Sequence, residues 1–188
     1  MFSENSNRLT PVNKLWESDE NNDLINRNFN RYLKELGEAN INEADLLQIL
    51  QQGKVLDVAC GEGNFVNDCL ERNIDAYGVD IALGNKSNVE RLTSSNKLPV
   101  KLKERLVAGD ATSLPFKNDS FNAITNQAGA FSYAHSPQEI IKTLQEQIRV
   151  LSPGGKIIIN PIEITTNSFF PVNFVNAFLD KDEKLTED

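Results

Sequence analysis

The chain has 188 residues and a formal net charge of -8, with 27 acidic against 19 basic side chains. A chain of this length forms one domain around a single sizeable core, and its negative charge repels polyanions, so we expect no nucleic-acid partner. Two cysteines without disulfide or metal-ligand spacing are typical of a reducing compartment. No apolar run reaches the roughly 20 residues that span a bilayer. We therefore expect a cytoplasmic protein with no membrane association and no bound metal.

The N-terminal part of the chain predicts two helices. Between residues 24 and 37, apolar side chains recur with a helical period and end at a glycine, a typical helix stop. Asn42 and Asp45 then have the spacing of a helix N-terminus. We interpret residues 1–52 as a helical cap that belongs to the same domain as the core, residues 53–188.

A strand, a glycine turn and a helix follow. Residues 55–58 form an apolar run that leads directly into Gly61 and Gly63. This order is typical of a nucleotide-binding α/β unit, in which small residues let the backbone approach a ligand. A pyrophosphate would bind at the helix N-terminus, where Asp57 and Glu62 would repel it. A cationic ligand fits these acids better.

Four further segments follow at the spacing of alternating strands and helices. Asp80 ends the second strand, roughly 20 residues beyond the turn, the spacing at which a carboxylate meets ribose hydroxyls. After the fourth strand, Ser136 and Glu139 form a capping pair around Pro137, and the helix that they open would cover the sheet. The segments are, in order, residues 76–81, 106–111, 120–126 and 149–159.

Together, the five segments resemble the class I S-adenosylmethionine-dependent methyltransferases over roughly positions 53 to 160. The resemblance implies a Rossmann-like, mostly parallel α/β sheet with helices on both faces. It also implies methyl transfer from S-adenosylmethionine to a small-molecule acceptor, and a set of cofactor-binding residues. These would be Asp57, Ala59, Gly61 and Gly63 around the methionine half, Asp80 on the ribose, Ile81, Asp110 and Ala111 on the adenine, and Asn126 and Gln127 at the methionine end.

Two positions depart from the family's pattern. Ala59 replaces the usual first glycine of the turn, and it fits unless the turn needs a positive φ there. Asn122 on the fourth strand replaces a common acid, and no motif supplies an obvious catalytic dyad. An alternative therefore stays open, a non-catalytic methyltransferase-like protein that binds the cofactor or a partner chain. A nucleotide-dependent oxidoreductase is disfavoured, since Val66 stands where the dinucleotide fingerprint has Gly or Ala.

His135 is the single histidine of the chain, and it lies in the loop after the fourth strand, where acceptors approach in this family. A solvent-exposed loop histidine is the simpler interpretation. A catalytic role as general base or substrate contact is the other, because imidazole titrates near neutral pH. We expect residues 131–135 and the cap around Trp16 to wall the acceptor pocket.

The C-terminal end is short for this family. Only 28 residues follow Asn160, whereas a closing hairpin with its linking helix needs roughly 40. We therefore expect the C-terminal strands to be missing, through truncation at the C-terminus, and the fifth strand to have an open edge. Either a helix that starts at Pro171 or self-association would cover that edge, so we expect a monomer or a weak homodimer.

Overall fold

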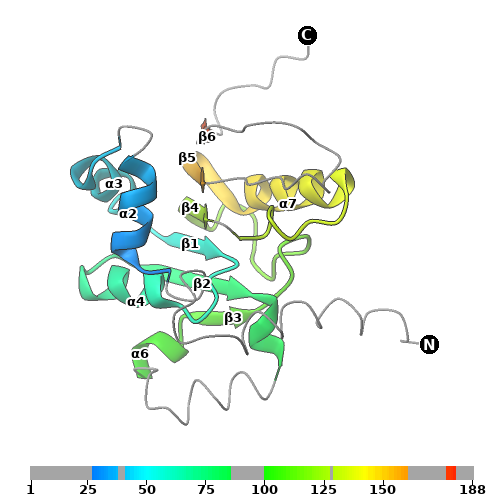
Figure 1. The fold of residues 1–188 in the computed structure, drawn as a ribbon, viewed down its shortest axis with the longest axis horizontal. Helices are drawn as coiled ribbons and strands as arrows, with labels where there is room; N and C mark the ends of the chain where they lie inside the picture. Colours follow the sequence, from blue (N-terminus) through cyan, green and yellow to red (C-terminus); the bar gives the residue numbers. More distant parts are fainter. Residues whose placement is uncertain (1–26, 38–40, 86–99, 128, 161–176, 181–188) are drawn as a thin grey trace.

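The structure is a computed structural model that describes residues 27–37, 41–85, 100–127, 129–160 and 177–180. These residues form a six-stranded sheet of order β3-β2-β1-β4-β5-β6 (Figure 1). Strands β1 to β5 are parallel, and β6 is antiparallel to β5. The elements are α2 (Phe29–Gly37), α3 (Glu43–Leu50), β1 (Val55–Val58), α4 (Asn64–Glu71), β2 (Ala76–Asp80), the 3-10 helix η1 (Ile81–Gly84), α6 (Val100–Lys103), β3 (Leu106–Ala108), β4 (Phe121–Gln127), α7 (Pro137–Val150), β5 (Leu151–Asn160) and β6 (Ala177–Asp180).

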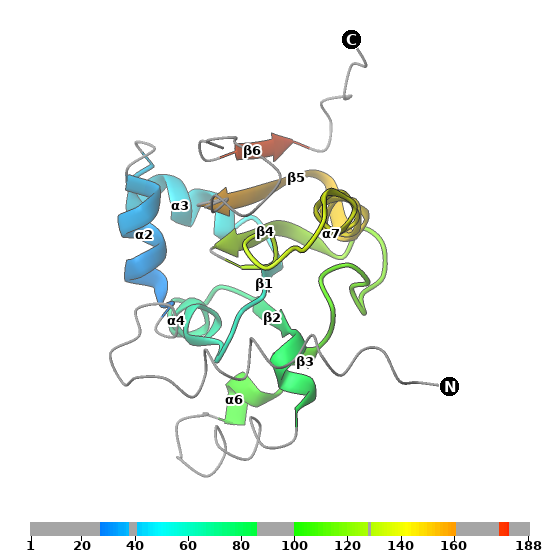
Figure 2. The same ribbon diagram turned by 45° about the vertical axis from the view of Figure 1, so that its right-hand side comes forward.

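Helices cover both faces of the sheet. Figure 2 shows α2, α3 and α4 on one face and α7 on the other. Successive strand residues point to opposite faces, so Val55 belongs to the hydrophobic cluster under α2 to α4, whereas Leu56 belongs to the cluster that includes Val150 of α7. A parallel sheet with both faces covered confirms the predicted Rossmann-like α/β class.

The two cap helices pack into the same core as the sheet. Asn42 caps α3 and exchanges hydrogen bonds with Asp45 in a capping box, as the sequence predicts. On α2, the Tyr32 ring stacks on Phe65 of α4 at a centroid distance of 3.9 Å, and Phe29 stacks on the same ring at 5.9 Å. Residues 24–26 of the expected first helix and Trp16 lie outside the described residues.

The C-terminal end corrects the prediction of missing strands. Backbone pairing joins β6 to β5, with Ala177 opposite Ile159 and Asp180 opposite Lys156. Residues 177–179 were expected within the covering helix and are strand instead, while Pro171 lies outside the described residues. The reason is physical: one antiparallel strand of four residues satisfies the backbone groups along the edge of β5, without the second strand that the length argument assumed.

Strand β5 begins with an irregular stretch. Its pairing with β4 runs from Phe121 opposite Leu151 to Ala123 opposite Lys156. The Pro-Gly-Gly segment at 153–155 lies within this irregularity, and Gly154 has a φ of 73°. The strand therefore contains a bulge at the end remote from the glycine turn.

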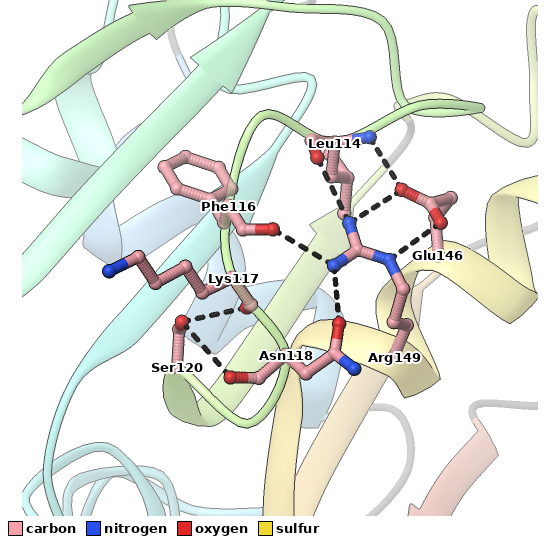
Figure 3. Close-up of polar contacts among 7 residues, drawn as sticks. All are labelled: Leu114, Phe116, Lys117, Asn118, Ser120, Glu146 and Arg149. Atoms are coloured by element: carbon pink, nitrogen blue, oxygen red, sulfur yellow. Dashed lines mark hydrogen bonds and ion pairs between the residues drawn. The ribbon is translucent and has the colours of Figure 1, made fainter.

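A polar clamp holds the loop between β3 and β4 against α7 (Figure 3). The Arg149 guanidinium donates to the carbonyls of Leu114 and Phe116 at 3.0 and 2.9 Å and to Asn118 Oδ1 at 2.9 Å. It also forms a bidentate ion pair with Glu146, in which Nε to Oε1 and Nη2 to Oε2 are both 2.8 Å. Glu146 in turn accepts from the Leu114 N–H at 2.7 Å. The clamp fixes where β4 begins relative to the helix behind it.

Candidate cofactor site

The glycine turn after β1 has a left-handed backbone at three positions. Gly61 and Gly63 have φ of 58° and 80°, and Ala59 has a φ of 58°. The turn therefore does need a positive φ at position 59, which is the case in which an alanine was not expected to fit. The alanine adopts it all the same, at a cost of about 1–2 kcal/mol for a residue with a Cβ. The turn stays compact, with the Gly63 N–H donating to the Cys60 carbonyl at 3.0 Å.

Asp80 ties the end of β2 to this turn. The carboxylate is 7% exposed, and Oδ2 accepts from the Gly61 N–H at 2.8 Å while Oδ1 accepts from the Ala82 N–H at 2.8 Å. Next to it, the Ile81 side chain is 41% exposed. An acid fixed by backbone donors thus lies beside an exposed aliphatic side chain at the carboxyl end of β2. Their contacts with ribose and adenine remain predictions.

Asp57 is a fully buried acid in the centre of the site. Its Oδ1 accepts from the Tyr32 hydroxyl at 2.7 Å and from Thr125 Oγ1 at 2.8 Å, whereas Oδ2 has no hydrogen-bond partner among the described residues. Burial raises the pKa of the Asp57 carboxyl to about 6, although Tyr32, Arg27 and Thr125 each act to lower it. Burying this carboxylate therefore carries a cost in free energy that the surrounding donors only partly offset.

The end of β4 adds more buried polar atoms without a partner. Neither amide atom of Asn126 forms a hydrogen bond, and Gln127 Oε1 forms none either. Gln127 Nε2 donates to the carboxylate of Glu35 on α2. With Asp57 Oδ2, four of the six unpartnered buried side-chain atoms in the described residues lie at the carboxyl ends of β1 and β4. Such atoms are rare in proteins, and a bound polar ligand or an ordered water would satisfy them.

The side chain of Arg27, a residue just before α2, contacts the same carboxyl ends of β1 and β4. Its Nη1 donates to the Gln127 carbonyl at 2.8 Å and its Nη2 to the Ala59 carbonyl at 2.7 Å. Burial lowers the pKa of Arg27, but the combined Coulombic effect of Tyr32, Asp57 and other acidic groups raises it above the ordinary value. Four residues of this arrangement were not predicted from the sequence: Arg27, Tyr32, Glu35 and Thr125. Tyr32 has the spacing of an apolar helix position, and no local pattern marks the other three.

Asp110 forms a turn directly after β3. Its Oδ1 accepts from both the N–H and the hydroxyl of Thr112, each at 2.8 Å, and the segment closes through a bridge to Ser113. This arrangement is an Asx-turn, in which the side chain replaces a backbone acceptor. The roles predicted for Asp110 and Ala111 at the adenine remain predictions.

The loop after β4 divides its aromatic residues between core and surface. Phe131 is buried in the cluster under α7, whereas the Tyr133 side chain is 42% exposed. His135 is exposed, and its backbone N–H donates to Glu139 Oε2 at 2.9 Å, which anchors the loop to the start of α7. Tyr133 and His135 therefore stay candidates for the acceptor side, and Phe131 has a packing role.

Asn122 lies at the other end of the sheet. It is the second residue of β4, and its Oδ1 accepts from the Lys54 N–H, before β1, at 3.1 Å. A side chain there cannot report on the acceptor, which would approach at the carboxyl ends of the strands. The replacement of an acid at position 122 thus has no bearing on the chemistry of the site.

Other ligand chemistry finds little support in the described part of the chain. Among those residues, no group of three or more His, Cys, Asp or Glu side chains gathers as metal ligands. No helix within them is long and apolar enough to cross a membrane. Cys60 and Cys69 are both buried, and burial raises the pKa of each thiol, so both are packing residues with little thiolate character.

Fold and site together define a Rossmann-like α/β protein with a polar, acid-lined ligand site at a glycine turn. Residues 55–155 match the family described as "Methyltransferase domain", which is more than half of the chain. The chain belongs to this family. The resemblance to the class I S-adenosylmethionine-dependent methyltransferases is thereby confirmed.

Individual relatives match the same region. The chain is 34% identical over 110 residues to a demethylmenaquinone methyltransferase of Renibacterium salmoninarum, covering 56% of this chain and 40% of that protein. It is 30% identical over 119 residues to a phthiotriol/phenolphthiotriol dimycocerosates methyltransferase of Mycobacterium leprae, covering 63% of this chain and 41% of that protein. The crystal structure of the PH0226 protein from Pyrococcus horikoshii is similar with a TM-score of 0.52 at 26% identity, covering 70% and 53%. The chain spans about two fifths of the length of these two curated relatives.

Proposed function

We propose that the chain binds S-adenosylmethionine at the carboxyl ends of β1, β2 and β4 and transfers its methyl group to a small-molecule acceptor. One observation carries this proposal: the unpartnered atoms of Asp57, Asn126 and Gln127 gather beside a turn with a left-handed backbone. A ligand with cationic and hydrogen-bonding groups would satisfy them, and this cofactor carries an ammonium, a sulfonium and a carboxylate.

The residues of the site fit the parts of the cofactor. Asp57 Oδ2 can accept from an ammonium group, and the Asn126 amide offers one donor and one acceptor atom for the amino-acid end. We propose that Asp80, at the end of β2, contacts the ribose and that the exposed Ile81 contacts the adenine. At Gly61, the backbone φ of 58° disfavours any side chain that would fill the cradle. Ala59, Gly63, Asp110, Ala111 and Gln127, which the sequence resemblance also implies, complete the set of residues that we propose to contact the cofactor.

When bound, the cofactor supplies a methyl group attached to a positively charged sulfur. The work of the protein is then to exclude water and to align the acceptor with that methyl group. A general base is needed only where the acceptor must lose a proton. His135, exposed in the loop after β4, is the residue that we propose for this role.

The relatives' names suggest the acceptor class. Their names specify demethylmenaquinone and phthiotriol or phenolphthiotriol dimycocerosates as the acceptors of those proteins. We propose an acceptor of this general character for the present chain, with Tyr133 and the cap helices forming part of its pocket. We further propose that residues 1–52 and 53–188 act as one domain, since Phe29 and Leu46 of the cap share the core cluster with Phe65.

The alternative of a non-catalytic family member rested on Asn122 and on missing C-terminal strands. Asn122 lies at the end of the sheet remote from the proposed site, and β6 pairs with β5. Neither observation now favours a non-catalytic family member.

Calorimetric titration with S-adenosylmethionine and S-adenosylhomocysteine tests the proposal. We expect binding by the unaltered protein and an affinity about ten- to more than a hundredfold weaker for Asp80→Ala, the range for hydrogen bonds to a charged group. The same substitution also removes the acceptor that holds the Gly61 N–H. Asp75→Ala is the matched control, because Asp75 precedes the opposite end of β2 and pairs with Arg105. Unchanged affinity in folded Asp80→Ala would refute the ribose assignment, and an unaltered protein that binds neither compound would refute the proposed function.

A further inference from the structure

The Arg27 guanidinium lies where two strand ends present their carbonyls. Its two terminal nitrogens donate to Ala59 and Gln127, at 2.7 and 2.8 Å, and so bridge the turn after β1 and the end of β4. A Cβ added at Gly61 would lie 3.1 Å from Arg27 Nη2, which places the guanidinium against the glycine turn as well. Arg27 is thus inside the proposed cofactor site.

The groups around this guanidinium are acceptors and acids. Two backbone carbonyls face it, and Asp57 and Asp80 act on its charge together with the Tyr32 and Tyr133 phenols. Carbonyl oxygens and ionised carboxylates only accept hydrogen bonds. A group of such acceptors favours a cation that carries N–H donors. The geometry therefore defines a cation subsite at the carboxyl ends of β1 and β4.

The ammonium group of the cofactor is a cation with N–H donors of the same kind. We propose that Arg27 occupies the ammonium subsite of S-adenosylmethionine, so that the guanidinium must leave before the amino-acid end of the cofactor can bind. This inference rests on the proposed function. It makes Arg27 an internal competitor that sets the affinity for the amino-acid end while leaving the adenosine end unaffected.

The side chain can leave without the helix that follows it. The Phe29 N–H donates to Asp68 Oδ2 on α4 at 2.9 Å, the Phe29 ring packs on Phe65, and the Tyr32 hydroxyl donates to Asp57. These contacts anchor α2 independently of the guanidinium. Displacement of Arg27 exchanges its charge-assisted hydrogen bonds to Ala59 and Gln127 for those of the ligand, so the competition lowers the apparent affinity of the subsite for the ligand.

A comparison of two ligands tests the inference. S-adenosylhomocysteine contains the amino-acid end, whereas 5′-methylthioadenosine keeps the adenosine and lacks it. We expect Arg27→Met, which keeps the length of the side chain without its charge, to bind S-adenosylhomocysteine about tenfold more tightly. Its affinity for methylthioadenosine should stay within about twofold, because Ile81 and Asp80 are untouched. Calorimetry gives both constants, and their ratio does not depend on the fraction of protein that is folded.

Arg72→Met is the matched control. Arg72 lies over the Phe29 ring at 4.3 Å and donates to the Asp68 carbonyl, so it joins the same helices without reaching the two strand-end carbonyls. The ratio of its affinities for S-adenosylhomocysteine and methylthioadenosine should equal that of the unaltered protein. If Arg27→Met does not fold, Arg27→Lys takes its place: a single ammonium cannot bridge two carbonyls as a guanidinium does, so the ratio should rise, but less.

Each outcome decides the inference. A ratio that rises in favour of S-adenosylhomocysteine supports internal competition by Arg27. An unchanged ratio, or one that falls because Arg27 holds the bound ligand's carboxylate, overturns it while leaving the proposed function intact. If the unaltered protein and the Arg27 variants bind neither ligand, the proposed function fails and the inference fails with it.

Discussion

Asp57 makes the stability of this domain depend on pH. Its carboxyl is fully buried and its pKa is raised from 3.8 to about 6, chiefly by burial. A raised carboxyl pKa means that the folded state binds the proton more tightly than the unfolded state. The stabilising contribution is therefore complete below about pH 3.8 and is lost as the pH rises through about 6.

Replacing this acid should remove that dependence. Relative to Asp57→Asn, the unaltered protein should lose about 2 kcal/mol of unfolding free energy between pH 4 and pH 7, from a shift of about two pKa units. Urea unfolding at several pH values, without cofactor, measures both curves. The variant should also bind S-adenosylhomocysteine more weakly, since it lacks the negative charge. Parallel stability curves for the two proteins would show that Asp57 is not the group that titrates.

At the scale of elements, α7 is fastened to the β3–β4 loop through Arg149. The fork-shaped guanidinium bonds Leu114, Phe116 and Asn118 while Glu146 holds its other side. The same contact lowers the pKa of Glu146, mainly through its hydrogen bonds with Arg149. The contribution of this pair to stability should therefore be present above the ordinary pKa of a glutamate and be lost as the pH falls below it.

Arg149→Lys should destabilise the fold by about 2–3 kcal/mol, because a lysine cannot supply donors in a fork and leaves partly buried carbonyls without partners. Chemical denaturation at pH 7 measures the change. Gln145→Ala, an exposed position on the same helix, is the control and should stay within about 0.5 kcal/mol. A loss in Arg149→Lys no larger than the control's would mean that the clamp is not a source of stability.

The helix α2 is the element that connects the cap to the site. Tyr32 donates to Asp57, and Glu35 accepts from Gln127. These two residues share one face of α2 because they are three positions apart. The cap therefore does more than cover the sheet: it supplies hydrogen-bond partners to Asp57 and Gln127, two residues of the proposed cofactor site.

At the scale of the whole molecule, β6 decides how the sheet ends. Its pairing covers β5 along Lys156 to Ile159, and β5 would otherwise present unpaired backbone groups to other chains. In the full chain, the amides of Ile157 to Ile159 should exchange slowly with solvent, and sedimentation should show a monomer. A variant that ends at Asn160 should lose protection at alternate β5 amides or self-associate. Rapid exchange across Ile157 to Ile159 in the monomeric full chain would contradict the pairing.

The sequence by itself determined the features that follow from local patterns. Apolar periodicity, the capping pair of Asn42 and Asp45, and an acid at the end of each early strand were sufficient for the α/β class, the order of elements and the family. Asp57, Gly61 and Asp80 could be placed at one edge because parallel strands bring their carboxyl ends together. These inferences need only neighbours in the chain and the rules of sheet topology.

The tertiary structure decided what depends on packing between distant segments. Arg27 reaches Gln127 across 100 residues, and Thr125 reaches Asp57 across 68; no local period marks such pairs. The sequence raised the question of a positive φ at Ala59, but only the folded turn answered it, and the placement of Asn122 beside Lys54 had no local signal at all. The pairing of β6 was missed because strand partners are chosen by the free edge that remains once the sheet has formed. The sequence determines which side chains are present, but the surroundings that set a side chain's pKa, its partners and its ligand exist only after folding.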